Sequence, residues 1–132
     1  MASNIQQSVT LPASPDELYD MYLDPAQHAA ITGQPVTIGA EPGSAFSAFG
    51  GVLQGRMLHT EPKRLIVQTW RSKNWRVEDM DSILVITFRE SGNQGQVELS
   101  HINVAAHDFQ DVNAGWRKYY WDPWREYLRK RR

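Results

Sequence analysis

The chain has 132 residues, 14 basic against 15 acidic side chains and a formal net charge of −1, and this length is typical of one domain with a single sizeable core. The balanced charge argues against binding to nucleic acid or to an anionic membrane surface. The lack of cysteine excludes disulfides, thiolate catalysis and cysteine-ligated zinc.

No stretch of the sequence has the features of a targeting or membrane segment. The start lacks the basic residues and apolar run of a secretory signal, and no run approaches the roughly 18 apolar residues of a membrane span. We therefore expect a soluble, cytoplasmic protein without membrane insertion, folded as one domain over residues 1–132.

The first part of the chain predicts one strand followed by two short helices. Residues 5–11 alternate loosely and lead into a proline-rich turn. Ser14 is expected to cap a helix that starts at Pro15, with Glu17 completing a capping box. A second short helix is predicted over residues 25–31.

The middle of the chain predicts an antiparallel meander, because short alternating runs are separated by glycine, proline and asparagine. The expected strands cover residues 36–38, 45–49, 65–70, 82–88 and 96–103, with a further strand that ends at the turn Glu61-Pro62-Lys63. Glycines at positions 50, 51 and 55 are expected where a strand bends or lies close to another backbone.

The C-terminal part predicts one long amphipathic helix, since from Asp108 the apolar period changes from two to between three and four. Pro123 should kink this helix or end its regular part near Asp122. A curved antiparallel sheet that grips this helix satisfies the order of elements and gives an α+β fold.

Three groups of residues resemble a known family. They are Phe49-Gly50-Gly51 with Gly55, then Ile66-Val67-Gln68-x-Trp70-Arg71 with Trp75, and finally Gly115-Trp116-x-x-Tyr119-Tyr120-Trp121. Together they resemble the activator of heat-shock-protein-90 ATPase homology domain of the START-like, or SRPBCC, helix-grip superfamily. The resemblance implies a single START-like domain, a curved sheet of about six to seven strands around the long helix, and a cavity between them that holds apolar ligands without a cofactor.

The same resemblance implies a chaperone or another protein as partner and a role in the stress response. The two-domain eukaryotic relatives make their principal chaperone contacts through a separate N-terminal domain, for which 132 residues leave no room. We therefore expect this chain to give little or no stimulation of chaperone ATP hydrolysis.

The candidate ligand-binding residues lie on strand faces that alternation and the resemblance turn toward the helix, and on the helix itself. They are Phe46, Gln68, Trp70, Leu84, Ile86, Phe88, Leu99, His101, Trp116 and Tyr120. Gln68 and His101 are polar groups on otherwise apolar faces, and buried polar groups need partners. Either they orient a ligand, or they satisfy each other or the backbone inside an ordinary core.

Three functions remain open. We favour non-enzymatic binding of a small apolar or amphipathic molecule in the cavity. The first alternative is a protein-interaction or chaperone-associated module, and the second is an enzyme that uses the cavity for acid–base chemistry, which a buried histidine–carboxylate pair opening onto the pocket would favour. The four histidines lack short ligand spacings and no serine sits in a glycine elbow, so we expect no metal, no catalytic residue and no cofactor.

Overall fold

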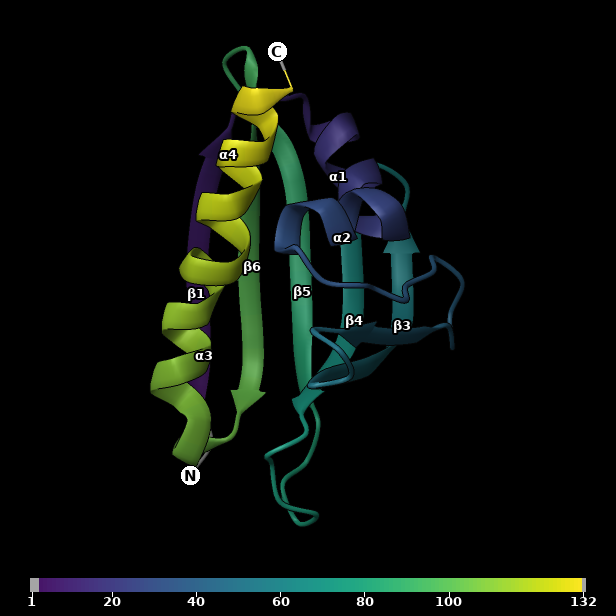
Figure 1. Ribbon diagram of the computed structural model, residues 1–132, viewed down its shortest axis with the longest axis vertical. Coiled ribbons are helices and arrows are strands. Elements are labelled where there is room, and N and C mark those ends of the chain that lie inside the picture. The colour runs from purple at the N-terminus through teal and green to yellow at the C-terminus, as the bar shows by residue number, and fades with distance from the viewer. Residues whose placement is uncertain (1–2, 132) are drawn as a thin grey trace.

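The computed structural model describes residues 3–131 and consists of a six-stranded antiparallel sheet with helices on one face (Figure 1). The spatial order of the strands is β1-β6-β5-β4-β3-β2. Their bounds are β1 Ser3–Leu11, β2 Ala45–Ala48, β3 Leu53–Glu61, β4 Leu65–Ser72, β5 Ser82–Ser91 and β6 Gln94–Val104. The expected α+β helix-grip fold, a curved sheet with a long C-terminal helix, is confirmed.

The two short helices begin where the capping signals predicted. They are α1 (Pro15–Leu23) and α2 (Pro25–Thr32). The Ser14 hydroxyl accepts a hydrogen bond from the Glu17 N–H at 3.2 Å, which satisfies one of the free N–H groups of the first turn. Gly33 ends α2 in the left-handed conformation, with φ of 81°. Both helices lie over the upper part of the sheet, beside α4 (Figure 1).

Two details of the sheet differ from the sequence prediction. Residues 36–38 form no strand, because Pro35 cannot donate to a ladder and only Thr37 pairs, in an isolated bridge to Ser47. The β5–β6 hairpin is longer than expected, since Ser91 still pairs with Gln94 across a tight turn. Gly92 makes that turn with φ of 62°.

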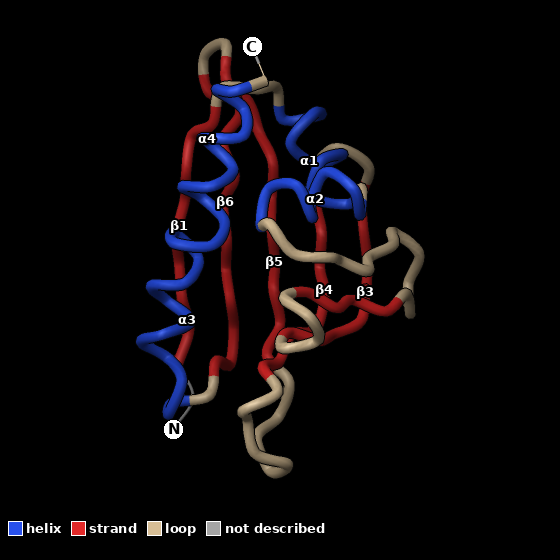
Figure 2. The backbone as a smooth tube through the Cα atoms, viewed as in Figure 1, coloured by secondary structure: helices blue, strands red, loops and turns tan. Residues whose placement is uncertain are grey.

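Gly55 lets β3 lie unusually close to β4. A side-chain carbon at this position would lie 2.0 Å from the Thr69 carbonyl oxygen, which only glycine avoids. The Arg56 N–H donates to the Thr69 hydroxyl at 2.8 Å beside it. Beyond this close approach, β2 and the adjoining part of β3 run across the lower end of the sheet (Figure 2).

The C-terminal helix continues through Pro123, and its regular α-helical hydrogen bonding is interrupted just before Asp122 (Figure 2). Its segments are η1 (Ala106–Asp108), α3 (Phe109–Trp116), the π-helical turn η2 (Arg117–Trp121) and α4 (Asp122–Lys130). The Asp122 N–H donates to the Arg117 carbonyl, five residues back. Since Pro123 has no N–H, this wide turn changes the hydrogen-bond register just before the proline and lets the helix continue.

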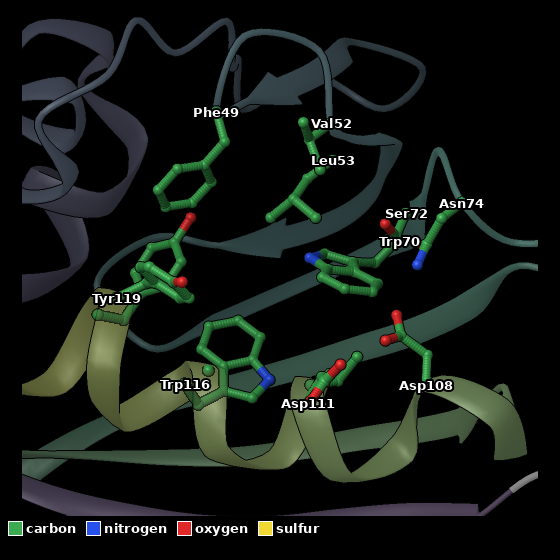
Figure 3. A pocket seen from close by; sticks show the side chains of 13 residues that line it. Phe49, Val52, Leu53, Trp70, Ser72, Asn74, Asp108, Asp111, Trp116 and Tyr119 are labelled. Atoms are coloured by element: carbon green, nitrogen blue, oxygen red, sulfur yellow. The ribbon is translucent and has the colours of Figure 1, made fainter.

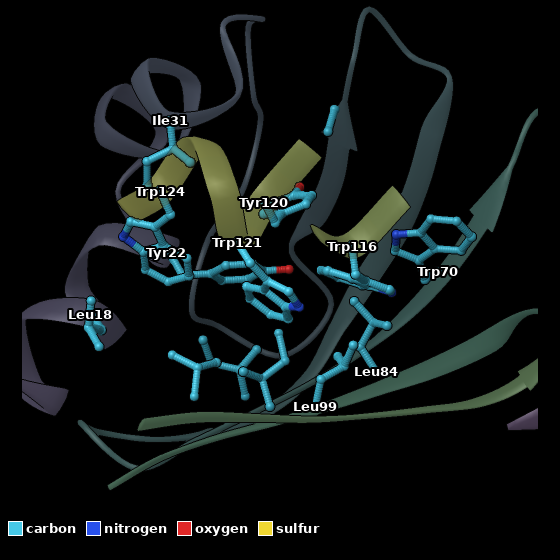
Figure 4. Packing of buried hydrophobic residues seen from close by; sticks show 14 of the residues in the cluster. Leu18, Tyr22, Ile31, Trp70, Leu84, Leu99, Trp116, Tyr120, Trp121 and Trp124 are labelled. Carbon is cyan, nitrogen blue, oxygen red and sulfur yellow. The ribbon is translucent and has the colours of Figure 1, made fainter. Parts of the chain in front are cut away.

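Side chains of the helix and the sheet interlock in one core (Figure 4). All five tryptophans are buried, and Trp121 lies between Trp116 and Trp124 with ring centroids 5.5 and 6.4 Å away. Leu84 and Leu99 meet them from the sheet. Within residues 3–131 no helix is both long and apolar enough to cross a membrane.

Candidate functional site

A cavity of about 340 Å³ lies at the lower end of the long helix, where the sheet curves away from it. Three segments form its walls (Figure 3). The turn before β3 and the start of that strand contribute Phe49, Val52 and Leu53; β4 and the loop after it contribute Trp70, Ser72 and Asn74; the helix contributes Asp108, Asp111, Val112, Gly115, Trp116, Tyr119 and Tyr120. Most of this lining is apolar or aromatic, as in sites that hold small organic molecules.

The π-helical turn and a glycine shape the helical wall. Tyr119 and Tyr120 are neighbours in the turn, and both rings meet Phe49 edge-on, with centroids 5.5 and 6.3 Å from it. Tyr120 is buried whereas Tyr119 is 46% exposed, so Tyr119 stands at the mouth. Gly115 has no side chain, which leaves the cavity open beside it. A Cβ at this position would make only ordinary contact with the Tyr119 ring, at 3.5 Å.

Carboxylates and other polar groups gather at the end of the cavity opposite Tyr119 (Figure 3). Asp108 is only 9% exposed, and its Oδ2 accepts a hydrogen bond from the Trp75 indole N–H at 2.8 Å. It precedes α3 but makes no side-chain capping bond to that helix. Asp111 lies one turn further along, on the same wall, and is exposed. The cavity is therefore apolar at one end and acidic at the other.

Three of the ten predicted site residues line this cavity, namely Trp70, Trp116 and Tyr120. The other seven are buried in the core and do not line it: Phe46, Gln68, Leu84, Ile86, Phe88, Leu99 and His101. The reason is that large aromatic side chains fill the space directly between helix and sheet, so that room is left only at the lower end. Contact of any of the ten with a ligand stays a prediction.

His101 is held by protein groups on both ring nitrogens. The Trp116 indole N–H donates to Nδ1 at 3.1 Å, so the ring proton is on Nε2, which donates to the Ser82 hydroxyl at 2.8 Å. Ser82 in turn donates to the Trp70 carbonyl at 2.6 Å. Burial lowers the pKa of His101 to about 3. His101 is therefore a neutral connector between helix and sheet.

A second buried chain of hydrogen bonds joins α1, α2, the long helix and β4. The His28 Nδ1–H donates to the Tyr22 carbonyl at 2.8 Å, which leaves Nε2 to accept from the Tyr120 hydroxyl at 2.9 Å. The Tyr22 hydroxyl donates to Gln68 Oε1 at 2.8 Å, and Gln68 Nε2 donates to the Thr69 carbonyl at 3.3 Å. Burial lowers the pKa of His28 to about 4, against a smaller opposing effect of the Tyr22 carbonyl, and raises the pKa of Tyr120. Gln68 and His101 therefore satisfy their polar groups through protein partners.

The described residues contain two histidine–carboxylate pairs, and neither lines the cavity. His59 pairs with Glu61 on an exposed edge, and His107 pairs with Asp79 at 2.8 Å in a separate surface hollow. No group of three or more histidine or acidic residues in the described part of the chain is placed to hold a metal ion.

Sequence reasoning missed Phe49, Asp108 and Asp111, among others, as lining residues. Phe49 was visible only as the start of a Phe-Gly-Gly turn, and nothing in the sequence shows that this turn folds onto the helix. A signal did exist for Asp108: it precedes Val112 by four residues, which places it on the apolar face of the helix.

The long helix packed on one face of a curved sheet, with a cavity at their lower contact, defines a START-like helix-grip protein. The sequence model of the family described as "Activator of Hsp90 ATPase homolog 1-like protein" matches residues 12–129. The chain therefore belongs to this family, which confirms the resemblance seen in its motifs.

Relatives and solved structures agree with this assignment. An activator of 90 kDa heat shock protein ATPase homolog from Dictyostelium discoideum is 32% identical over 80% of this chain and 27% of the relative. The human homolog 1 is 26% identical over 86% of this chain and 33% of the relative. The chain thus spans about a quarter to a third of the length of these relatives.

Among solved structures, an HSP90 activator from Plasmodium falciparum superimposes with a TM-score of 0.82 at 19% identity, over 90% of this chain and 91% of the other. The Aha1 dimer of Colwellia psychrerythraea gives a TM-score of 0.75 at 18% identity, over 89% and 90% of the two chains. At these identities the comparison shows the shared fold.

Proposed function

We propose that this protein binds a small, flat, apolar or amphipathic molecule in the cavity beside the π-helical turn. The observation that carries the proposal is the cavity itself: about 340 Å³ stays open beside a core into which five tryptophans are packed. This volume lies within the range of small-molecule sites. The rings of Phe49, Trp70 and Trp116 offer flat apolar surfaces to such a ligand.

Binding of 2-naphthylmethanol, a neutral two-ring probe, should raise the melting temperature. A ligand that binds only the native state stabilises it by about 2.7 kcal/mol at 100 times its Kd. The variant Gly115→Leu should lose this shift, because its side chain enters the cavity from a position where a Cβ is tolerated. Leucine also favours a helix over glycine, so the variant should fold.

The matched control is Ala114→Leu, which adds the same side chain at an exposed neighbouring position outside the cavity. This variant should keep the shift. A shift that Gly115→Leu retains would place binding elsewhere on the molecule. No shift with neutral, cationic or anionic two-ring probes would overturn the proposal.

A second candidate, a chaperone-associated interaction module, rests on family membership and on one exposed loop. Between β4 and β5 the chain projects beyond the end of the sheet (Figure 1), and there Val77 is 98% and Met80 77% exposed. Exposed apolar side chains of this kind suit contact with another protein.

The test of this second candidate is ATP hydrolysis by a purified 90 kDa heat-shock protein with and without this chain. We expect little or no stimulation, because the chain corresponds to only 27–33% of the length of the curated activator homologs. A several-fold increase that the double variant Val77→Ser/Met80→Ser reduces would support the interaction module and contradict this expectation.

A further inference from the structure

The charges that line the cavity are all negative. Of its 13 lining residues, Asp108 and Asp111 are the acidic ones, and no lysine or arginine lines it. Two cations of the neighbouring segments have partners of their own. The Arg71 guanidinium lies 5.9 Å from the Trp75 ring and donates to the Asp81 carboxylate at 2.6 Å, and Lys118 lies 5.2 Å from the ring of Tyr119, at the opposite end of the cavity.

Asp108 retains hydrogen-bonding capacity on the cavity side. Its Oδ2 is held by the Trp75 indole, while Oδ1 accepts no hydrogen bond from any residue between 3 and 131. The side chain is nine-tenths buried and is turned away from the free N–H groups of α3 toward the cavity (Figure 3). A carboxylate oxygen without a protein partner can accept a hydrogen bond from a charged donor, which is stronger than one from a neutral donor.

The aromatic walls favour the same kind of ligand. The rings of Trp70 and Trp116 line the cavity next to the acidic end, and the faces of such rings attract cations. An ammonium group there would meet a negative carboxylate and electron-rich rings, while the apolar part of the molecule would lie against Phe49 and Leu53. A carboxylate or sulfonate group in the same place would meet two like charges.

We propose that the ligand of this cavity is a cationic amphiphile, a flat apolar molecule that carries a protonated amine, and that Asp108 and Asp111 bind its ammonium group. This proposal rests on the proposed function and specifies the class of ligand. Asp108 is the inner contact, because it is the more buried of the two, and Asp111 stands toward solvent.

The test compares three probes of similar shape by calorimetric titration at pH 7: the cation 2-naphthylmethylamine, the neutral 2-naphthylmethanol and the anion 2-naphthaleneacetate. We expect the amine to bind about tenfold more tightly than the alcohol, because a hydrogen bond between charged groups is roughly twice as strong as a neutral one. The acetate should bind more weakly than both. Added salt should weaken binding of the amine more than that of the alcohol.

Two substitutions that keep side-chain shape test whether the carboxylates cause the tighter binding of the amine. Asp108→Asn should bring the amine and the alcohol to within about twofold of each other, and Asp111→Asn should have a smaller effect in the same direction. The control Asp122→Asn removes the same charge from the same long helix outside the cavity, where the side chain is 54% exposed, and should leave the ratio unchanged.

The possible results separate this inference from the proposed function. If the wild-type protein binds the alcohol as tightly as the amine, the cationic inference is overturned and the apolar site stands. An amine preference that survives in Asp108→Asn/Asp111→Asn would also overturn it. If none of the three probes binds, the proposed function fails and this inference fails with it. The wild-type comparison needs no variant to fold.

Discussion

Replacing Trp116 with alanine should lower the free energy of unfolding by about 3–5 kcal/mol, the range for large buried aromatic residues. Trp116 is 3% exposed, lies 4.9 Å from the ring of Tyr120 and 5.5 Å from that of Trp121, and joins the helix to the sheet through His101. Alanine would leave a hole between helix and sheet and deprive His101 Nδ1 of its donor. Urea unfolding followed by far-ultraviolet circular dichroism measures the loss.

The variant Trp116→Phe separates packing from hydrogen bonding at this position. It keeps an aromatic ring but lacks the indole N–H, so its cost should lie near the 1–3 kcal/mol of an unsatisfied buried acceptor. Equal losses for the two variants would mean that the hydrogen bond to His101 dominates. A Trp116→Ala protein within 1 kcal/mol of wild type, on the order of a surface substitution, would contradict the docking of the helix described here.

Acidification from pH 7.5 to pH 5.0 should destabilise the protein by about 4 kcal/mol, through His28 and His101. Burial lowers the pKa of His28 to about 4 and of His101 to about 3, against 6.5 for an ordinary histidine. Below pH 6.5 the unfolded chain therefore binds two protons that the native protein does not. Stability is full above pH 6.5 and is lost as the pH falls toward the native pKa values.

The hydrogen bonds give a structural reason for the same effect. Protonation would add an N–H to His101 Nδ1, where the Trp116 N–H already points, and to His28 Nε2, where the Tyr120 hydroxyl donates. The interval down to pH 5.0 stays above the ordinary aspartate pKa of 3.8. Acidic side chains such as Asp24, whose pKa is lowered by its hydrogen bond from Gln27, therefore contribute little to the expected loss.

Two histidine variants test the assignment by urea unfolding at both pH values. His101→Gln should be less stable than wild type at pH 7.5, because Ser82 and Trp116 lose an aligned partner, but its loss on acidification should fall by about half. The control His59→Gln removes a histidine whose side chain is 56% exposed and should leave the pH dependence unchanged. Equal pH dependence in wild type and His101→Gln would contradict the account.

The sequence predicts this fold well because its local signals agree with one another. The Ser14 cap, the alternation of residues 82–88 and the apolar stripe after Asp108 each specify an element that the structure contains. The site could be predicted only in part. Alternation shows that Leu84 and Leu99 face inward, but whether an inward residue meets another side chain or an open space depends on packing, and here Trp116 and Trp121 occupy that space.

The π-helical turn keeps the buried side chains of the long helix pointing toward the sheet along its whole length. Apart from Trp121, its buried side chains recur at an interval of four: Asp108, Val112, Trp116, Tyr120, Trp124 and Leu128. An ideal α-helix has 3.6 residues per turn, so such a stripe would drift by about 40° at each step and leave the sheet before Leu128. A π-helical turn contains about one more residue than an α-helical turn and so reduces the accumulated rotation. The apolar halves on either side of the turn thus face the same sheet, and the wide turn that aligns them also forms part of the cavity wall through Tyr119 and Tyr120.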